Sequence, residues 1–153
     1  ISQLNNILEN LDNDKSIFSH NNYELIKGEA LGLRAFLHLE VLRLFGPIPG
    51  PDAVGKRTIP YVTEFTRDPN KLVSINYELV LENILKDLND AEELLEKVDP
   101  IVDPENTNRR LNNPSINWDG WTPPADLWQA FRQVRFHYYA VLGTHARYYH
   151  WIG

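Results

Sequence analysis

The sequence predicts an all-α protein built of stacked helical hairpins with long irregular loops. Apolar residues recur at helical spacing in four segments, which we expect to form helices near residues 1–11, 23–45, 76–98 and 126–152. The segments between them are polar or rich in proline, so we expect no substantial sheet. A hydrophobic content of 42% in 153 residues is enough for the core of one domain, which we expect to span residues 1–153.

The first expected helix, residues 1–11, carries its large apolar side chains on one face. Their spacing of three and four residues is that of an amphipathic helix, and they are Ile1, Leu4, Ile7, Leu8 and Leu11. Residues 10–22 are mostly polar, so we expect them to connect this helix to the next one.

Residues 24–51, ELIKGEALGLRAFLHLEVLRLFGPIPGP, contain the helix against which the others are expected to pack. Its two apolar strips are separated by narrow polar edges, which consist of Lys27, Arg34 and His38 on one side and of Glu29, Glu40 and Arg43 on the other. A helix that is apolar on both flanks lies between neighbours rather than on a surface. Gly28 and Gly32 each cost the helix about 1 kcal/mol, so we expect close packing to compensate for them. Gly46 stands where a left-handed C-cap is expected, and Pro47 prevents continuation of the helix.

Residues 77–98 show the clearest amphipathic pattern. The stripe that we expect to be buried consists of Tyr77, Val80, Leu81, Ile84, Leu88, Ala91 and Leu95. The opposite face is acidic, with Glu78, Glu82, Asp87, Asp90, Glu92, Glu93 and Glu96 against Lys86 and Lys97. Most of the chain's net charge of −6 is therefore expected on one solvated helix face.

The last expected helix, residues 126–152, contains the pattern Leu-Gly-x-x-Ala at residues 142–146. The same pattern occurs at residues 31–35 of the central helix. We therefore expect Gly143, like Gly32, to lie against a neighbouring helix. The pattern also resembles the core of tetratricopeptide helices, although no strict repeat of 34 residues fits the chain.

Four segments resemble the SusD/RagB family, in the order in which the family has them. They are the central helix, IPYVTEF at residues 59–65, YELVLENILKDLNDAEELL at residues 77–95 and YYAVLGTHARYYHWIG at residues 138–153. The resemblance implies the tetratricopeptide-like, helical portion of a longer protein, a starch- or nutrient-binding outer-membrane lipoprotein of Bacteroidetes. It further implies that a signal peptide and a lipid-carrying cysteine lie upstream, and that only this lipid anchor contacts the membrane.

The resemblance also implies a function. Proteins of this family are non-catalytic, lie on the cell surface, bind oligosaccharides and work with a SusC-like TonB-dependent transporter in the outer membrane. The alternative that the residues leave open is a tetratricopeptide-type scaffold, which binds a peptide in the groove of its stacked helices.

Composition narrows the possible chemistry. The absence of cysteine excludes disulfides, thiolate metal sites and cysteine nucleophiles, and the net charge of −6 argues against a nucleic-acid partner. None of the five histidines stands four residues from another, so we expect no metal site and no cofactor.

The carboxylates Glu92, Glu93 and Glu96 are expected in solvent, where acid–base catalysis is disfavoured. A calcium site at Asp99, Asp103 and Glu105 would lack the usual acidic spacing. These residues form no recognisable catalytic site, so we expect the protein not to be an enzyme.

The candidate ligand site is a polar loop that contains two tryptophans. Trp118 and Trp121 stand among Asn117, Asp119 and Gly120, in a stretch too polar to form a helix. Indole rings stack on the apolar faces of sugar rings, and neighbouring amide and carboxylate groups can bond sugar hydroxyls. We therefore predict glycan contacts at Asn117, Trp118, Asp119 and Trp121. The alternative is that the two rings fold back as a lid over the helices.

Overall fold

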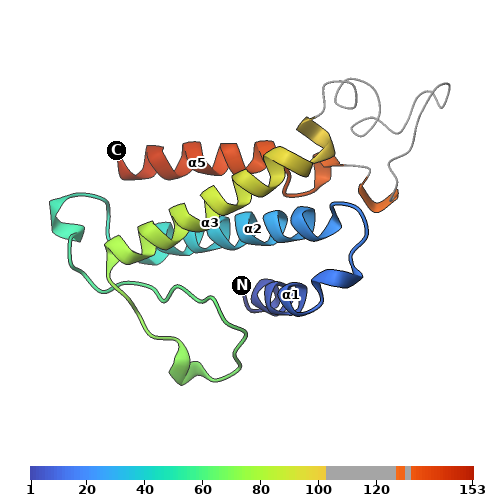
Figure 1. The fold of residues 1–153 in the computed structure, drawn as a ribbon. Coiled ribbons are helices and arrows are strands. Elements are labelled where there is room, and N and C mark those ends of the chain that lie inside the picture. Colours follow the sequence, from blue (N-terminus) through green and yellow to red (C-terminus); the bar gives the residue numbers. More distant parts are fainter. Residues whose placement is uncertain (103–126, 130–131) are drawn as a thin grey trace.

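The computed structural model describes residues 1–102, 127–129 and 132–153 (Figure 1). Its α-helices are α1 (Ser2–Asn13), α2 (Asn22–Phe45), α3 (Tyr77–Val98) and α5 (Tyr138–Ile152). Short 3₁₀ helices occur at Lys15–Ile17, Pro51–Ala53, Pro69–Lys71, Pro100–Val102, Leu127–Gln129 and Arg132–Val134. Apart from one isolated bridge between Arg57 and Asn76, the described part of the chain contains no β-structure. The predicted all-α class is confirmed.

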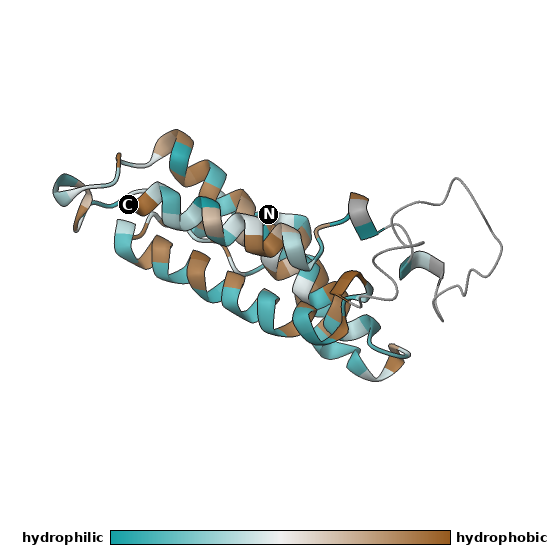
Figure 2. Ribbon diagram, turned by 90° about the horizontal axis from the view of Figure 1, so that it is seen from above, coloured by the Kyte–Doolittle hydropathy of each residue, from teal (hydrophilic) through white to brown (hydrophobic). Residues whose placement is uncertain are grey.

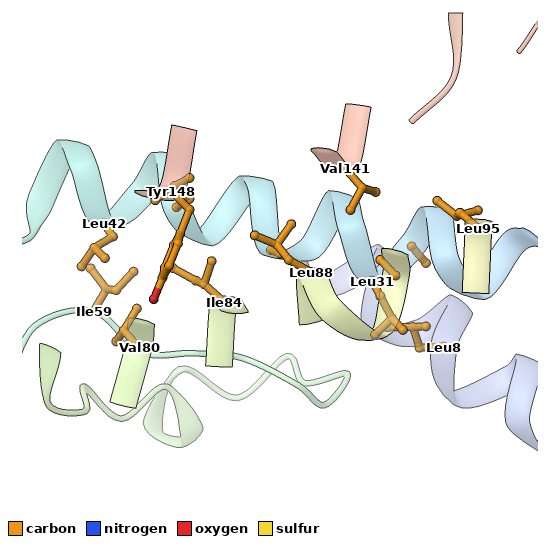
Figure 3. Close-up of a cluster of buried hydrophobic side chains, with 14 of the residues drawn as sticks. Leu8, Leu31, Leu42, Ile59, Val80, Ile84, Leu88, Leu95, Val141 and Tyr148 are labelled. Atoms are coloured by element: carbon orange, nitrogen blue, oxygen red, sulfur yellow. The ribbon is translucent and has the colours of Figure 1, made fainter. Parts of the chain in front are cut away.

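Helix α2 is the centre of the arrangement. Helix α3 runs antiparallel along it, α5 lies on α3 on the other side, and α1 contacts the first part of α2 (Figure 1). Each helix carries both hydrophobic and hydrophilic segments, as expected when one face packs and another meets solvent (Figure 2). The buried cluster draws side chains from all four helices and from the extended run after residue 58, among them Leu8, Leu31, Leu42, Ile59, Val80, Ile84, Leu88, Leu95, Val141 and Tyr148 (Figure 3).

The glycines of α2 confirm the expected close packing. A Cβ atom added to Gly28 would lie 2.7 Å from Leu95 Cγ in α3. One added to Gly32 would lie 2.8 Å from Phe136 Cε1 and 2.9 Å from Val141 Cγ2 in α5. These distances are too short for a real Cβ, so the absence of side chains at both positions lets the neighbours approach α2.

The corresponding prediction for Gly143 is wrong. An added Cβ there would meet no atom within 4 Å, and Gly143 lies on the exposed side of α5. The repeated Leu-Gly-x-x-Ala pattern therefore has different surroundings in the two helices, because α5 turns Val141, Thr144 and Tyr148 toward the core.

The end of α2 also differs from the expectation. Gly46 is extended (φ −84°, ψ 173°) rather than left-handed, and its N–H donates to Leu42 O at 2.7 Å. An added Cβ would lie 2.5 Å from that same oxygen, so glycine is needed here for space and not for a positive φ.

The last helix begins later than predicted, at Tyr138 rather than near residue 126. The described residues before it form the 3₁₀ turns Leu127–Gln129 and Arg132–Val134. The physical reason is Asp99, whose Oδ2 accepts a hydrogen bond from the Tyr138 N–H at 2.9 Å. A carboxylate at this point stabilises a helix N-terminus, and the Arg132 side chain turns inward to the same carboxylate.

Candidate functional site

The four residues predicted to contact a glycan, Asn117, Trp118, Asp119 and Trp121, lie outside the described residues. Their role therefore stays a prediction. The described residues instead show two buried polar networks and two cavities.

The first network centres on Asp87 and joins three helices. Arg34 Nε donates to Asp87 Oδ2 at 2.6 Å and Arg34 Nη2 to Asp87 Oδ1 at 2.8 Å, which makes a bidentate ion pair between α2 and α3. Arg34 Nη1 donates to Asn5 Oδ1 of α1 at 3.1 Å. The Tyr61 hydroxyl donates to Asp87 Oδ2 at 2.5 Å. We call these four residues, together with His38, the Asp87 network.

The sequence-based placement of Asp87 on the solvated acidic face is wrong, since its exposed fraction is 3%. Arg34 and His38, expected on a polar edge, are buried as well. A signal was present in the sequence: Asp87 follows Ile84 by three residues and precedes Ala91 by four, which places it on the buried stripe of α3.

The Asp87 network also holds the extended run after Ile59. His38 Nδ1 lies 2.9 Å from Arg34 O and His38 Nε2 accepts from the Val62 N–H at 3.0 Å, so Nδ1 carries the proton of a neutral imidazole. Burial lowers the pKa of His38 to about 4. Asn5 Nδ2 donates to Val62 O at 2.9 Å and to Glu64 O at 3.1 Å. Helix side chains thus supply the hydrogen bonds that a neighbouring strand would otherwise make.

The second network centres on Asp99 and fixes the segment before α5. Arg132 Nε and Nη2 donate to the two carboxylate oxygens of Asp99, each at 2.8 Å. Glu29 of α2 accepts from Arg132 Nη1, and its Oε2 accepts from Arg135 Nη2 at 2.6 Å. The Ile101 N–H donates to Asp99 Oδ1 at 3.1 Å. We call Glu29, Asp99, Arg132 and Arg135 the Asp99 network.

The carboxylates considered for chemistry have other partners. Both oxygens of Asp99 serve the Asp99 network, which leaves the calcium alternative without one of its three ligands, and Asp103 and Glu105 lie outside the described residues. Glu92 Oε2 lies 3.0 Å from His145 Nε2, and Glu93 pairs with Lys97. Within the described ranges, no group of three or more histidine and carboxylate side chains could hold a metal ion.

Two cavities border the networks. The larger, of about 270 Å³, lies between α1, α2 and the residues before α5, and its apolar lining consists of Leu4, Ile7, Ile26, Ala30, Leu33 and Phe136. The ion-paired Glu29 and Arg135 also line it. The smaller, of about 120 Å³, lies between the extended run at Tyr61 and the loop at Lys71.

Comparison with known families identifies the family of this chain. A family model described as "starch-binding associating with outer membrane" matches residues 1–107. The chain belongs to the SusD-like family. The match covers α1, α2, the extended run and α3, and therefore the whole Asp87 network of this SusD-like chain. No curated protein and no solved structure matches it. In the described part of the chain, no helix is both long and apolar enough to cross a membrane.

Proposed function

We propose that this SusD-like chain belongs to a non-catalytic, surface-exposed lipoprotein that captures oligosaccharides and passes them to a TonB-dependent transporter of the outer membrane. The observation that carries the proposal is the family match over residues 1–107, whose description names both starch binding and the outer membrane. The helical fold is the one that the family resemblance implies.

The buried networks support a binding role. A binding protein gains affinity when its frame is ordered before the ligand arrives, because less conformational entropy is then lost on binding. The Asp87 network joins α1, α2, α3 and the extended run, and the Asp99 network joins α2 to the start of α5. The described helices and the extended run are therefore ordered before any ligand arrives.

The glycan contacts would come from Trp118 and Trp121. Titration of the chain with malto-oligosaccharides, followed by intrinsic tryptophan fluorescence, should give a saturable change that Trp118→Ala or Trp121→Ala removes. Trp128→Ala is the matched control, because the Arg135 guanidinium stacks on the Trp128 ring at 5.0 Å within the frame. A change that survives both loop substitutions would place the sugar elsewhere.

The transporter would contact the outer face of α3. Glu82 and Glu93 are exposed there and Asp90 is half-buried. Reversing all three to lysine should reduce co-purification with the cognate transporter, whereas Asp14→Lys with Glu64→Lys, at exposed carboxylates off α3, should leave it unchanged. Equal recovery of both variants would exclude this face as the contact.

The second candidate function is a tetratricopeptide-type scaffold that binds a peptide. The apolar cavity of about 270 Å³ between α1 and α2 favours it, because such scaffolds accept apolar side chains between their helices. Ile26→Lys would block this cavity. Loss of a protein partner with glycan binding intact would support the scaffold.

A further inference from the structure

The extended run between α2 and α3 presents the edge of a β-strand without a neighbouring strand. Val62 directs both of its backbone groups to the helices, since its N–H donates to His38 Nε2 at 3.0 Å and its carbonyl accepts from Asn5 Nδ2 at 2.9 Å. In a β-strand, both backbone groups of one residue point to the same edge, and those of the next residue point to the opposite edge. The backbone groups of Tyr61 and Thr63 therefore face away from the helices.

This outer edge is paired only where the run begins. The Ile59 carbonyl accepts from the Ile75 N–H at 3.3 Å, on the arm of the loop that returns to α3. Beyond Pro60 the two arms diverge (Figure 1). In the described part of the chain, neither the N–H nor the C=O group of Tyr61 or of Thr63 has a hydrogen-bond partner. We call these four backbone groups the free edge. Unpaired groups along a strand edge are a template for another strand.

Space for a ligand lies beside the free edge. The cavity of about 120 Å³ is lined by residues 60–64 and Thr66 of the run, and by Lys71 and Val73 of the returning arm. Thr63, Lys71 and Val73 are exposed, so a ligand can reach the cavity from solvent. The free edge therefore borders an accessible site and not the packed interior of the protein.

The run is already held in the conformation that a strand needs. Asn5, Glu9 and His38 bond backbone groups of its inner edge. The Tyr61 hydroxyl donates to Asp87 Oδ2 at 2.5 Å. A strand that pairs with an edge ordered in advance loses less conformational entropy than one that must order its partner.

The geometry favours a polypeptide over a sugar as the ligand. An extended main chain presents a donor and an acceptor at every second residue, which is the spacing of the free edge. Sugars usually stack on an exposed aromatic ring. Tyr61 is the one aromatic residue among those that line the cavity, and its ring is stacked on His38 with the centroids 3.9 Å apart. That ring is therefore turned toward the helices.

We propose that an extended segment of the TonB-dependent transporter pairs with the free edge as an added β-strand. The inference rests on the proposed function for the identity of the partner. The run lies within residues 1–107, which match a family described by its association with the outer membrane, so a contact shared by that family is expected in this part of the chain. The added strand would supply main-chain hydrogen bonds beside the charged contact proposed for the outer face of α3.

Two substitutions of Thr63 separate main-chain from side-chain contacts. Thr63→Pro removes the free N–H without breaking a hydrogen bond within the described chain, whereas Thr63→Ala keeps that N–H. Proline also favours an extended residue before it, which Val62 already is. Thr63→Pro should weaken binding of the cognate transporter about tenfold, because the paired strand loses a donor, and Thr63→Ala should leave binding unchanged. Circular dichroism melts show whether both variants are folded.

Hydrogen exchange of the unaltered chain is the second measurement. In the complex, the Thr63 amide should exchange about tenfold more slowly than in the free chain. The Val62 amide is the internal control, since it is bonded to His38 in both states. Unchanged exchange at Thr63 with the transporter bound would overturn the inference and leave the partnership intact.

Two other outcomes would also count against the added strand. Protection of the Thr63 amide by malto-oligosaccharides without the transporter would overturn the inference, because the cavity would then be a sugar site. Failure of the unaltered chain to bind the transporter would contradict the proposed partnership itself, and this inference with it.

Discussion

Replacement of Asp87 by asparagine tests the Asp87 network most severely. The substitution keeps the size of the side chain but removes its charge, so Arg34, which is 7% exposed, would be left without a counter-charge. Breaking a buried ion pair from one side costs about 3–5 kcal/mol. Tyr61 would also lose a charged acceptor for its hydroxyl. Since a domain is typically stable by about 5–15 kcal/mol, Asp87→Asn should remove a large part of the free energy of unfolding.

Urea denaturation followed by circular dichroism measures this effect. Asp90→Asn is the matched control, because Asp90 pairs with Lys86 on the surface of the same helix and such pairs contribute about 0–1 kcal/mol. The double variant Arg34→Met with Asp87→Leu should recover much of the loss, since it leaves no unpaired charge in the core. A loss below about 1 kcal/mol for Asp87→Asn would show that the buried ion pair between Arg34 and Asp87 contributes little to stability.

Three further predictions follow from the packing and the networks. Gly32→Leu should destabilise by about 1–3 kcal/mol through overpacking against Phe136, whereas Gly143→Leu should not destabilise, and thermal melts compare them. Because burial lowers the pKa of His38 to about 4, the unfolded chain takes up a proton between pH 6.5 and 4 that the folded chain does not. The free energy of unfolding should therefore fall by about 3 kcal/mol as the pH drops through this window, and His38→Gln should flatten the fall. Asp99→Ala should destabilise by about 3–5 kcal/mol in urea, since Arg132 would stay buried without its main partner.

Helical periodicity predicted the parts of the fold that depend on local spacing. The starts and ends of α2 and α3 agree with the expected ranges to within about a residue, because each has a continuous apolar pattern and a clear stop signal. The close packing at Gly32 was also predictable, since a glycine in a helix interior needs a compensating contact.

The remaining features depend on contacts between residues distant in the sequence. The start of α5 depends on Asp99, which lies 39 residues before Tyr138. The burial of Asp87 depends on Arg34, 53 residues away. A charged residue is expected in solvent unless its partner is known, and periodicity within one helix cannot identify that partner. The prediction of close packing at Gly143 was wrong for the same reason, because the same local pattern meets different neighbours in α2 and α5.

Calorimetric titration of the chain with malto-oligosaccharides of increasing length is the strongest test of the proposed glycan binding. We predict saturable binding that strengthens with oligosaccharide length until the site is filled, and that Trp118→Ala with Trp121→Ala abolishes. An unbranched β-linked glucan serves as the control for starch-type linkage. Absence of heat with every malto-oligosaccharide, in a chain shown by circular dichroism to be folded, would contradict the claim that this SusD-like chain binds starch-type glycans.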